Sequence, residues 1–576
     1  MLEQRASQTR AESELPGNPV EPKACNRNAL RDCLFLSLIV SLSLVLYIKG
    51  LGFYSDDWHF LGLLDNSSDQ SLFGLIGSVF PDTRLRPMQT LYVAVPYWLF
   101  GPHPLGYHLI NAVVFTITII LFYLSLSKLL PMRLFMITIP LVYALLPHYS
   151  TDRFWYIAFV ANLSVGLYFL SLYSDLRAIP AERAHALRWR LVSILGLLCS
   201  ALAYEVILPL FLLNPFLAWR YSHRFQRPTY RRQPTRRALL GPLAVNILVI
   251  ALVTTYKILI TRKDASGFVH TFGIYGDYSS HLLRLAVGAI GVNFGSYGIG
   301  LPVKVWRDLR FYPDAKILAG TGLIGLTIFV YLYRTVGRTT IDLAREASYF
   351  KLMGFGLVLF VAGYATFLTN GNVEFASSGI SNRVAIAAAL GVAILFVAMI
   401  GWISWVLPSP RIRSNCFCFL VTLLCASGFL LNNTIGAFWV DASRKQQEII
   451  ASIRQQFPTL PPDTTLILDG VCPYTGPGIV FECYWDVSGM LRTYYHDPSV
   501  HGDIVKRNLQ VGEDGLHTRI YGEQKYYPYS DKLFLVDVER NQVHILKDPD
   551  AARLLLTLEE TRNCPEGSEG FGARIF

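Results

Sequence analysis

The stretch AIAAALGVAILFVAMIGWISWVL, residues 385–407, contains no charged side chain. A helix rises about 1.5 Å per residue, so roughly twenty residues cross the ~30 Å hydrocarbon core of a bilayer. Inside lipid the backbone must satisfy its own hydrogen bonds, which favours a helix over any open structure. Residues 385–407 therefore predict a transmembrane helix, and similar stretches recur along the chain.

The composition indicates a protein with many such helices. Of the 576 residues, 52% are hydrophobic and only 16% are charged, which is too apolar for a soluble chain of this length. Two weaker stretches, 86–101 and 281–302, are expected to be interfacial or re-entrant helices. The stronger runs predict an all-α polytopic membrane bundle of about eleven transmembrane helices, at residues 33–52, 105–129, 132–147, 154–175, 189–204, 206–220, 238–260, 316–334, 352–369, 385–407 and 416–434.

Positive charge is concentrated in loops between these runs. The net charge is +10, and the stretch 220–237 holds seven arginines and no acidic residue. Short basic loops stay in the cytoplasm, so this pattern predicts topology, and we expect no nucleic-acid partner. With the N-terminus inside, the loops 176–190 and 334–351 are also cytoplasmic, and the C-terminal tail is outside.

This topology divides the chain into three expected parts. Residues 1–30 form a cytoplasmic tail, and residues 31–434 form the transmembrane domain, with an outer-face catalytic loop at 53–86. Residues 435–576 form an extracytoplasmic domain. The basic inner loops favour a bacterial inner (plasma) membrane, which would place the last domain in the periplasm.

The last part has the pattern of a small α+β domain. Residues 441–456 predict an amphipathic helix, and residues 464–469, 532–537 and 542–547 predict strands. If this domain lies outside the cytoplasm, Cys472 and Cys483 are expected to form a disulfide. The alternative is that both are free thiols, together with Cys564.

Two adjacent carboxylates follow the first apolar run, in Phe53-Tyr-Ser-Asp-Asp-Trp-His59. Acidic side chains at the mouth of a membrane bundle are unfavourable unless they are solvated, paired or functional. Partial burial raises a carboxyl pKa toward working pH, which suits a general base acting on a hydroxyl acceptor. The alternative is that Ser55 or Asp56 only caps a helix that begins near Asp57.

Further motifs follow the acidic pair in a fixed order. They are Arg84-Leu-Arg-Pro87, Leu99-Phe-Gly101, Leu105-Gly-Tyr-His-Leu-Ile-Asn111, Pro147-His148 and Ala203-Tyr-Glu205. Over residues 33–220 this order resembles the N-terminal half of the GT-C glycosyltransferases, multi-span enzymes that use lipid-linked sugar donors. The resemblance is greatest to the branch of the protein O-mannosyltransferases and related bacterial membrane enzymes.

The resemblance implies that a sugar passes from a polyprenyl-phosphate-linked donor to a glycan, lipid or protein acceptor at the outer face. The first-loop acid, either Asp56 or Asp57, would be the general base. The leaving phosphate needs positive charge in a site of low dielectric. Five cations on the outer side are candidates for this role: Arg84, Arg86, Arg262, Lys263 and Arg383. The alternative for Arg383 is ordinary snorkelling of its side chain at the interface.

Other polar residues are expected near the outer face. In the family, acids of the second outer loop help to bind acceptor or metal, but Asp152 precedes Arg153, so an ion pair is an alternative. Glu205 is expected to be a site residue or a buried structural partner. His59 and His108 are supporting candidates, and no histidine spacing matches a zinc motif. No cofactor is predicted to be required, with a divalent metal as the alternative.

Two other classes of protein remain as alternatives, a transporter or flippase and a noncatalytic envelope protein. Transporters place charged sites near the bilayer midplane, often in repeated halves. Here the acidic residues are expected at one membrane face and in the first half of the chain, which favours an enzyme.

Overall fold

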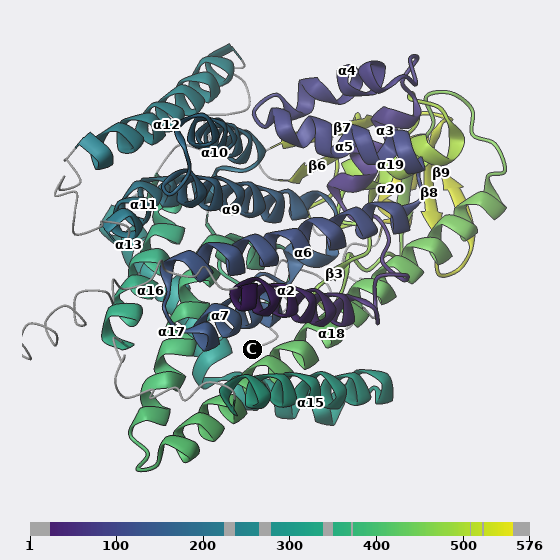
Figure 1. Ribbon diagram of the computed structural model, residues 1–576. Helices are drawn as coiled ribbons and strands as arrows, with labels where there is room; N and C mark the ends of the chain where they lie inside the picture. Colours follow the sequence, from purple (N-terminus) through teal and green to yellow (C-terminus); the bar gives the residue numbers. More distant parts are fainter. Residues whose placement is uncertain are drawn as a thin grey trace, which may run out of the picture.

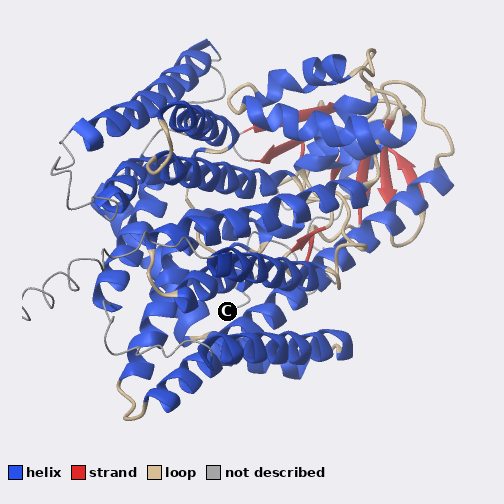
Figure 2. Cartoon of the chain, viewed as in Figure 1, coloured by secondary structure: helices blue, strands red, loops and turns tan. Residues whose placement is uncertain are grey.

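The computed structural model describes residues 23–223, 237–263, 278–337, 349–369, 373–506, 508–520 and 523–556. Most of these residues are helical, and strands gather at one end of the molecule (Figure 2). A helical bundle forms the larger part, and a C-terminal domain of strands and helices lies at one end of it (Figure 1).

The membrane part is built from helices that differ widely in length. They are α2 (Lys23–Leu44), α3 (Asp56–Asp65), α4 (Leu72–Thr83), α5 (Pro87–Phe100), α6 (Pro104–Leu129), α7 (Arg133–Leu145), η1 (Pro147–Tyr149), α8 (Thr151–Phe154), η2 (Ile157–Phe159), α9 (Val160–Ala178), α10 (Arg183–Ala203), η3 (Glu205–Leu212), α11 (Asn214–Ser222), α12 (Arg237–Lys263), α13 (Tyr278–Ile290), η5 (Gly291–Ile299), α14 (Leu301–Phe311), α15 (Ala315–Gly337), α16 (Tyr349–Tyr364), η6 (Ala365–Thr369), η7 (Ile380–Ala385), α17 (Ile386–Trp405) and α18 (Pro410–Gln456).

Nine helical segments within the described ranges are long and apolar enough to cross a membrane. All but one overlap stretches that were predicted to span; the exception is Tyr278–Ile299, where the sequence predicted an interfacial or re-entrant helix. The stretches 132–147 and 206–220 give no helix of that kind, because α7 has 13 residues and η3 and α11 divide the second stretch. The predicted span 33–52 overlaps α2, which ends at Leu44. The predicted number of about eleven is therefore not confirmed.

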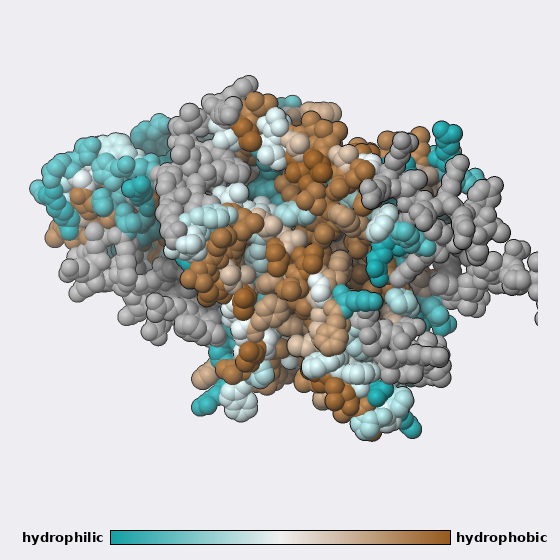
Figure 3. All heavy atoms as spheres, turned by 90° about the vertical axis from the view of Figure 1, so that its left-hand side faces the viewer, coloured by the Kyte–Doolittle hydropathy of each residue, from teal (hydrophilic) through white to brown (hydrophobic). Residues whose placement is uncertain are grey.

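The apolar surface of the bundle agrees with a lipid surrounding. Apolar side chains dominate the middle of the face in Figure 3, and polar ones lie toward its margins. Large apolar side chains on several candidate spans are exposed, among them Leu252, Val287 and Val361. With no internal partner, such side chains are stable in contact with lipid tails. The chain is an integral, multi-pass membrane protein.

Close backbone contact holds α16 against α17. A Cβ added at Gly391 would lie 2.4 Å from the carbonyl oxygen of Gly356, and one at Gly363 would lie 2.4 Å from the backbone nitrogen of Ala388. In lipid, where burial of apolar surface gives little advantage, small residues that allow close packing stabilise a helix pair. These glycines therefore fix the distance between the two helices.

A buried carboxylate joins four helices near the start of α2. Asp32 accepts hydrogen bonds from Nε and Nη2 of Arg133 at 2.9 and 2.5 Å. It also accepts the hydroxyls of Tyr123 and Tyr331 at 2.7 and 2.6 Å. Because Asp32 is fully buried and every partner comes from a different helix, this cluster is structural.

The helix α18 runs without a break from the membrane part into the C-terminal domain. It has 47 residues, and its last part contains the predicted amphipathic helix at 441–456. The boundary predicted between residues 434 and 435 lies inside this helix. At 1.5 Å per residue, α18 is about 70 Å long, more than twice the hydrocarbon thickness of a bilayer.

The C-terminal domain is built on a four-stranded mixed sheet of order β4-β1-β8-β9. Strand β1 pairs in parallel with β4 and β8, and β9 pairs antiparallel with β8. The predicted strands and the α+β class are confirmed. The elements are β1 (Thr465–Asp469), β2 (Tyr474–Thr475), β3 (Gly478–Ile479), α19 (Tyr484–Tyr495), β4 (His501–Ile504), β5 (Gln510–Val511), β6 (Gly515–Ile520), β7 (Glu523–Pro528), β8 (Leu533–Asp537), β9 (Gln542–Ile545) and α20 (Pro549–Leu555).

The predicted disulfide between Cys472 and Cys483 is wrong. Cys483 is a buried free thiol at the N-terminus of α19, whereas Cys472 takes part in a disulfide. Cys483 is fully buried in the core of the domain. Cys564 lies outside the described residues.

Candidate active site

The acidic pair opens α3, in the first loop after α2. Residues 51–54, which precede the acidic pair, form an irregular buried segment. Ser55 has a φ of 44°, a left-handed value that non-glycine residues rarely adopt. The helix begins at Asp56, and Ser55 makes no side-chain capping hydrogen bond. The alternative that Ser55 or Asp56 only caps a helix is not supported, because Asp56 lies inside α3 and the Ser55 hydroxyl, at the N-cap position, contacts the C-terminal domain instead.

Asp57 is held by backbone groups. It is 2% exposed, and its Oδ2 accepts the N–H of Tyr54 at 3.0 Å while Oδ1 accepts that of Ile157 at 2.9 Å. Burial raises the pKa of Asp57 well above its usual value, although the bonds from Tyr54 and Ile157 oppose the rise. Both carboxylate oxygens are thus engaged in joining the first loop to η2.

Asp56 has a different environment. Its side chain is half-buried, and its carboxylate has no hydrogen bond or ion pair with any residue that the structure describes. Burial raises the pKa of Asp56, while the charges of Arg383, His59 and Arg86 lower it. Asp56 is therefore an open carboxylate surrounded by positive or ionisable groups, and Asp57 is not.

Arg383 lies near a second acid as well. Its guanidinium sits 5.4 Å from the centroid of the Trp155 ring and forms no ion pair with a described residue. Asp152 is fully buried, and neither of its carboxylate oxygens has a hydrogen-bond partner among the described residues. Burial raises the pKa of Asp152 well above its usual value, and Arg383 is the first of the charges that oppose this.

The alternative ion pair between Asp152 and Arg153 is not formed in the described part of the chain. Arg153 instead donates from Nη2 to the carbonyl oxygens of Ala144 at 2.5 Å and Leu146 at 3.2 Å. Arg153 therefore holds the end of α7, and the charges of both Arg383 and Arg153 act on Asp152.

Glu205 is a partner of two cations. Arg86 donates from Nε and Nη2 at 3.1 and 2.5 Å, and Lys257 of α12 donates from Nζ at 2.9 Å. The guanidinium of Arg86 also lies 4.2 Å from the ring centroid of Tyr204. Arg86 is thus committed to a structural pair, which agrees with the structural alternative for Glu205.

The remaining candidates are dispersed. His59 Nε2 lies 2.7 Å from Asp82 Oδ2, and the buried His108 contacts the Gly52 carbonyl oxygen through Nε2 at 3.0 Å. The carbonyl oxygen of Arg84 accepts the Tyr256 hydroxyl at 2.8 Å. The side chains of Arg262 and Lys263 lie outside the described residues. No group of three histidine, cysteine or acidic side chains suited to a metal ion occurs in the described ranges.

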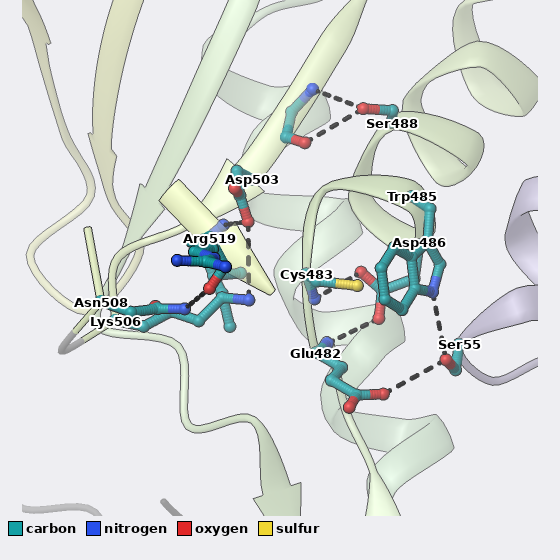
Figure 4. Close-up of polar contacts among 12 residues, drawn as sticks. Ser55, Glu482, Cys483, Trp485, Asp486, Ser488, Asp503, Lys506, Asn508 and Arg519 are labelled. Atoms are coloured by element: carbon teal, nitrogen blue, oxygen red, sulfur yellow. Dashed lines mark hydrogen bonds and ion pairs between the residues drawn. The ribbon is translucent and has the colours of Figure 1, made fainter. Parts of the chain in front are cut away.

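The C-terminal domain contacts the first loop directly, which the sequence did not predict. Ser55 Oγ donates to Glu482 Oε2 at 3.3 Å and accepts from the Trp485 indole at 3.3 Å (Figure 4). Asp486 accepts the N–H groups of Glu482 and Cys483, at 2.5 and 3.0 Å, and so fixes the start of α19 (Figure 4). Burial raises the pKa of Asp486 to about 8.

The helices α3 and α19 touch through two glycines. A Cβ added at Gly489 would lie 2.2 Å from the carbonyl oxygen of Trp58, and one at Gly62 would lie 3.0 Å from the Cα of Gly489. At the far end of α3, His496 Nδ1 lies 2.6 Å from Asp65 Oδ2. The position of Gly489 within an amphipathic stretch was the one signal in the sequence for this contact.

A small cavity of about 10 Å³, room for a single water, lies beside Asp57. Its walls are apolar and aromatic, and they include Phe53, Tyr107 and Tyr156. Asp57 lines this cavity and Asp56 does not, so the two adjacent carboxylates have different surroundings.

No protein-family model matches the chain, and no curated protein matches it. The solved structures to which it is similar include two of ArnT from Cupriavidus metallidurans. The apo form has a TM-score of 0.35 and 15% identity, and the form bound to undecaprenyl phosphate has 0.35 and 16%; each match covers 81% of this chain and 84% of that chain. Similarity at this level does not by itself establish a shared fold or function, so the candidate site is defined by its own geometry: Asp56, Arg383 and Asp152 at the end of the bundle that carries the C-terminal domain.

Proposed function

We propose that this protein is a membrane glycosyltransferase that moves a sugar from a polyprenyl-phosphate-linked donor to an acceptor at the outer face. The observation that carries the proposal is Asp56: a half-buried carboxylate with no hydrogen-bond partner among the described residues, on which the charge of Arg383 acts. In the proposed reaction Asp56 removes the proton from an acceptor hydroxyl, and that oxygen attacks the anomeric carbon. The bond from the anomeric carbon to the phosphate oxygen breaks, and the phosphate leaves with the electron pair.

Asp56 is favoured over Asp57 as the base because a base needs a free oxygen that reaches the acceptor. Both oxygens of Asp57 already accept backbone N–H groups. Asp57 is therefore proposed as a positioning residue, which fixes the first loop against η2 so that Asp56 faces the site. Burial raises the pKa of Asp56 and so brings it closer to the pKa of the acceptor hydroxyl from which the proton is removed.

Arg383 is favoured as the contact to the donor phosphate. Among the sequence candidates, Arg86 is engaged by Glu205, whereas Arg383 has no carboxylate partner in the described structure. A guanidinium presents a planar set of donors that matches two phosphate oxygens. Asp152 lies within the influence of the same cation, and we propose that it supports the acceptor or helps to orient Arg383.

The C-terminal domain is proposed to set the position of the base. It contacts α3 at Ser55, along the glycine contact and at Asp65, so it controls both ends of the helix that begins with Asp56. The start of α3 lies beside the C-terminal domain (Figure 1), and a transporter would instead place its charged site near the bilayer midplane.

The test is complementation of a deletion strain, with the envelope glycans, glycolipids and glycoproteins analysed by mass spectrometry. The parent protein should restore a glycosylated product that the deletion strain lacks. Asp56→Asn should restore none while its amount in the membrane and its melting temperature stay as in the parent. Asp69→Asn is the matched control, because it removes an exposed carboxylate from the same loop and should restore the product.

Other outcomes are equally informative. Product formation by Asp56→Asn at the parental rate would show that Asp56 is not the base. Movement of a lipid-linked sugar between leaflets, with no new glycosidic bond in any strain, would identify a transporter instead.

A further inference from the structure

A second cavity lies apart from Asp56, where α14, α18 and the loop before η7 meet. It measures about 30 Å³, space for about two water-sized groups, and is lined by both polar and apolar side chains. Its polar lining includes Lys304, Arg307 and Asp308 from α14 and Ser377 and Ser378 from the loop. None of these residues belongs to the site described above.

Lys304 is the central feature of this cavity. It is only 5% exposed, its Nζ donates to Ser377 Oγ at 3.2 Å, and it lies 5.3 Å from the centroid of the Tyr297 ring. It forms no ion pair with any residue of the described chain. An ammonium group has three donors, so a single hydroxyl leaves most of its hydrogen-bonding capacity unused. A buried charge in that situation is unfavourable unless a counter-charge occupies the cavity.

The neighbouring charges do not cancel that of Lys304. Asp308 is 2% exposed and its Oδ1 accepts from Nε and Nη2 of Arg307, at 3.1 and 2.8 Å. That pair balances itself, so the ammonium of Lys304 is the excess charge of the cavity. Burial lowers the pKa of Lys304 to about 8, which still leaves it mainly protonated at neutral pH.

The exposed side chains of α14 indicate the kind of environment that surrounds this helix. Val303, Trp306 and Phe311 are 71%, 66% and 62% exposed, while Lys304 and Asp308 face inward. A short helix with large apolar side chains on one side and charges on the other is typical of the boundary between lipid and water. This pattern favours a position of α14 at headgroup depth, where phosphate groups are abundant.

We propose that this cavity, with Lys304, Ser377 and Ser378, is a second anion-binding site that takes a phosphate mono- or diester group at headgroup depth. Hydroxyls and an ammonium are suitable donors for the oxygens of such a group. None of Asp56, Asp152 and Arg383 lines this cavity. The loop beside the cavity is held by the carbonyl oxygen of Ser377, which accepts from Tyr297 and from Asn382.

Binding is measured on the full chain in nanodiscs made of uncharged lipid, by native mass spectrometry and by the rise in melting temperature. The probes are short-chain phosphatidic acid, inorganic phosphate and, as the phosphate-free probe, short-chain diacylglycerol. Lys304→Met removes the buried charge. Arg310→Met is its matched control, because it removes one exposed positive charge from the same helix and leaves the cavity intact.

The expected result is that the parent and Arg310→Met bind phosphatidic acid alike, while Lys304→Met binds it about tenfold more weakly, as for the loss of one charge-assisted hydrogen bond. Binding of inorganic phosphate with similar affinity would identify free phosphate as the source, and its failure to bind would identify a lipid headgroup. Equal affinity of Lys304→Met and Arg310→Met, or equal binding of diacylglycerol, would overturn the proposal. If Lys304→Met does not fold, Ser377→Ala takes its place, with an expected weakening of about fivefold and the same refuting outcome.

Discussion

Replacing Arg383 by glutamine tests how the proposed site treats the leaving phosphate. The substitution keeps a polar side chain against Trp155 but removes the one guanidinium whose charge acts on both Asp56 and Asp152. Loss of one preorganised donor to a developing negative charge lowers kcat by about 10²- to 10³-fold, or roughly 3–4 kcal/mol of transition-state stabilisation. Because Arg383 has no ion pair with a described residue that the substitution would break, the melting temperature should change little. Arg383→Lys keeps the positive charge but lacks the planar set of donors of a guanidinium, so its kcat should be about tenfold lower than that of the parent.

The same substitution also has a signature in the pH profile. The base must be ionised to act, so kcat/KM rises as the pH rises through the pKa of Asp56. Arg383 lowers that pKa, and its removal therefore moves the acidic limb of the profile to higher pH. Arg383→Lys should leave the limb near its parental position. The assay is transfer of radiolabelled sugar in proteoliposomes across a pH series, with the donor and acceptor identified by the complementation experiment. An Arg383→Gln protein with parental kcat/KM and an unmoved acidic limb would refute the assigned role.

Three further predictions concern the rest of the molecule. Asp32→Asn should lower the free energy of unfolding by about 3–5 kcal/mol, because it leaves the charge of Arg133 without its partner. The double variant Asp32→Asn with Arg133→Met should lose much less stability than the sum of the single variants, because no charge is left unpaired. Thermal unfolding in detergent with a double-mutant cycle measures this coupling, and strict additivity would contradict it. Gly489→Val should force α19 away from α3, destabilise the protein by about 1–3 kcal/mol and abolish sugar transfer while the bundle stays folded. Product formation and the melting temperature of the full chain are measured together. Full activity would show that this contact does not position the base. Cys483 should react with a thiol reagent only after unfolding, and Cys472 only after reduction, as peptide mass spectrometry reports; alkylation of Cys472 without reductant would disprove the assignment.

Local patterns predicted the parts of the fold that depend on local physics. Residues 385–407 form a span because an uncharged run of that length has no other stable state in lipid. Strands β1 and β8 coincide with short apolar runs, and β9 with an alternating one. The same reasoning wrongly predicted a span for the stretch 206–220. Its hydropathy indicates a span, but Pro209 and Pro215 favour a 3-10 segment and a new helix start, which hydropathy does not register.

The candidate site was predictable in outline only. The sequence located the acidic pair, but adjacent carboxylates look alike in a sequence, and only the backbone N–H groups of Tyr54 and Ile157 distinguish Asp57 from Asp56. Ile157 lies 100 residues away, so no local pattern contains that information. The contact of α3 with α19 is longer in range still, and it depends on the path of α18.

The unbroken course of α18 has a consequence for how this chain tolerates change. Successive residues of a helix are turned by about 100° and shifted by about 1.5 Å, so deleting one residue near position 435 would rotate everything downstream by that angle. A flexible linker would absorb such a deletion, but a rigid helix transmits it, and the partner of Ser55 would then point elsewhere. Insertions and deletions in this part of the helix should therefore be tolerated only in multiples that restore the helical phase.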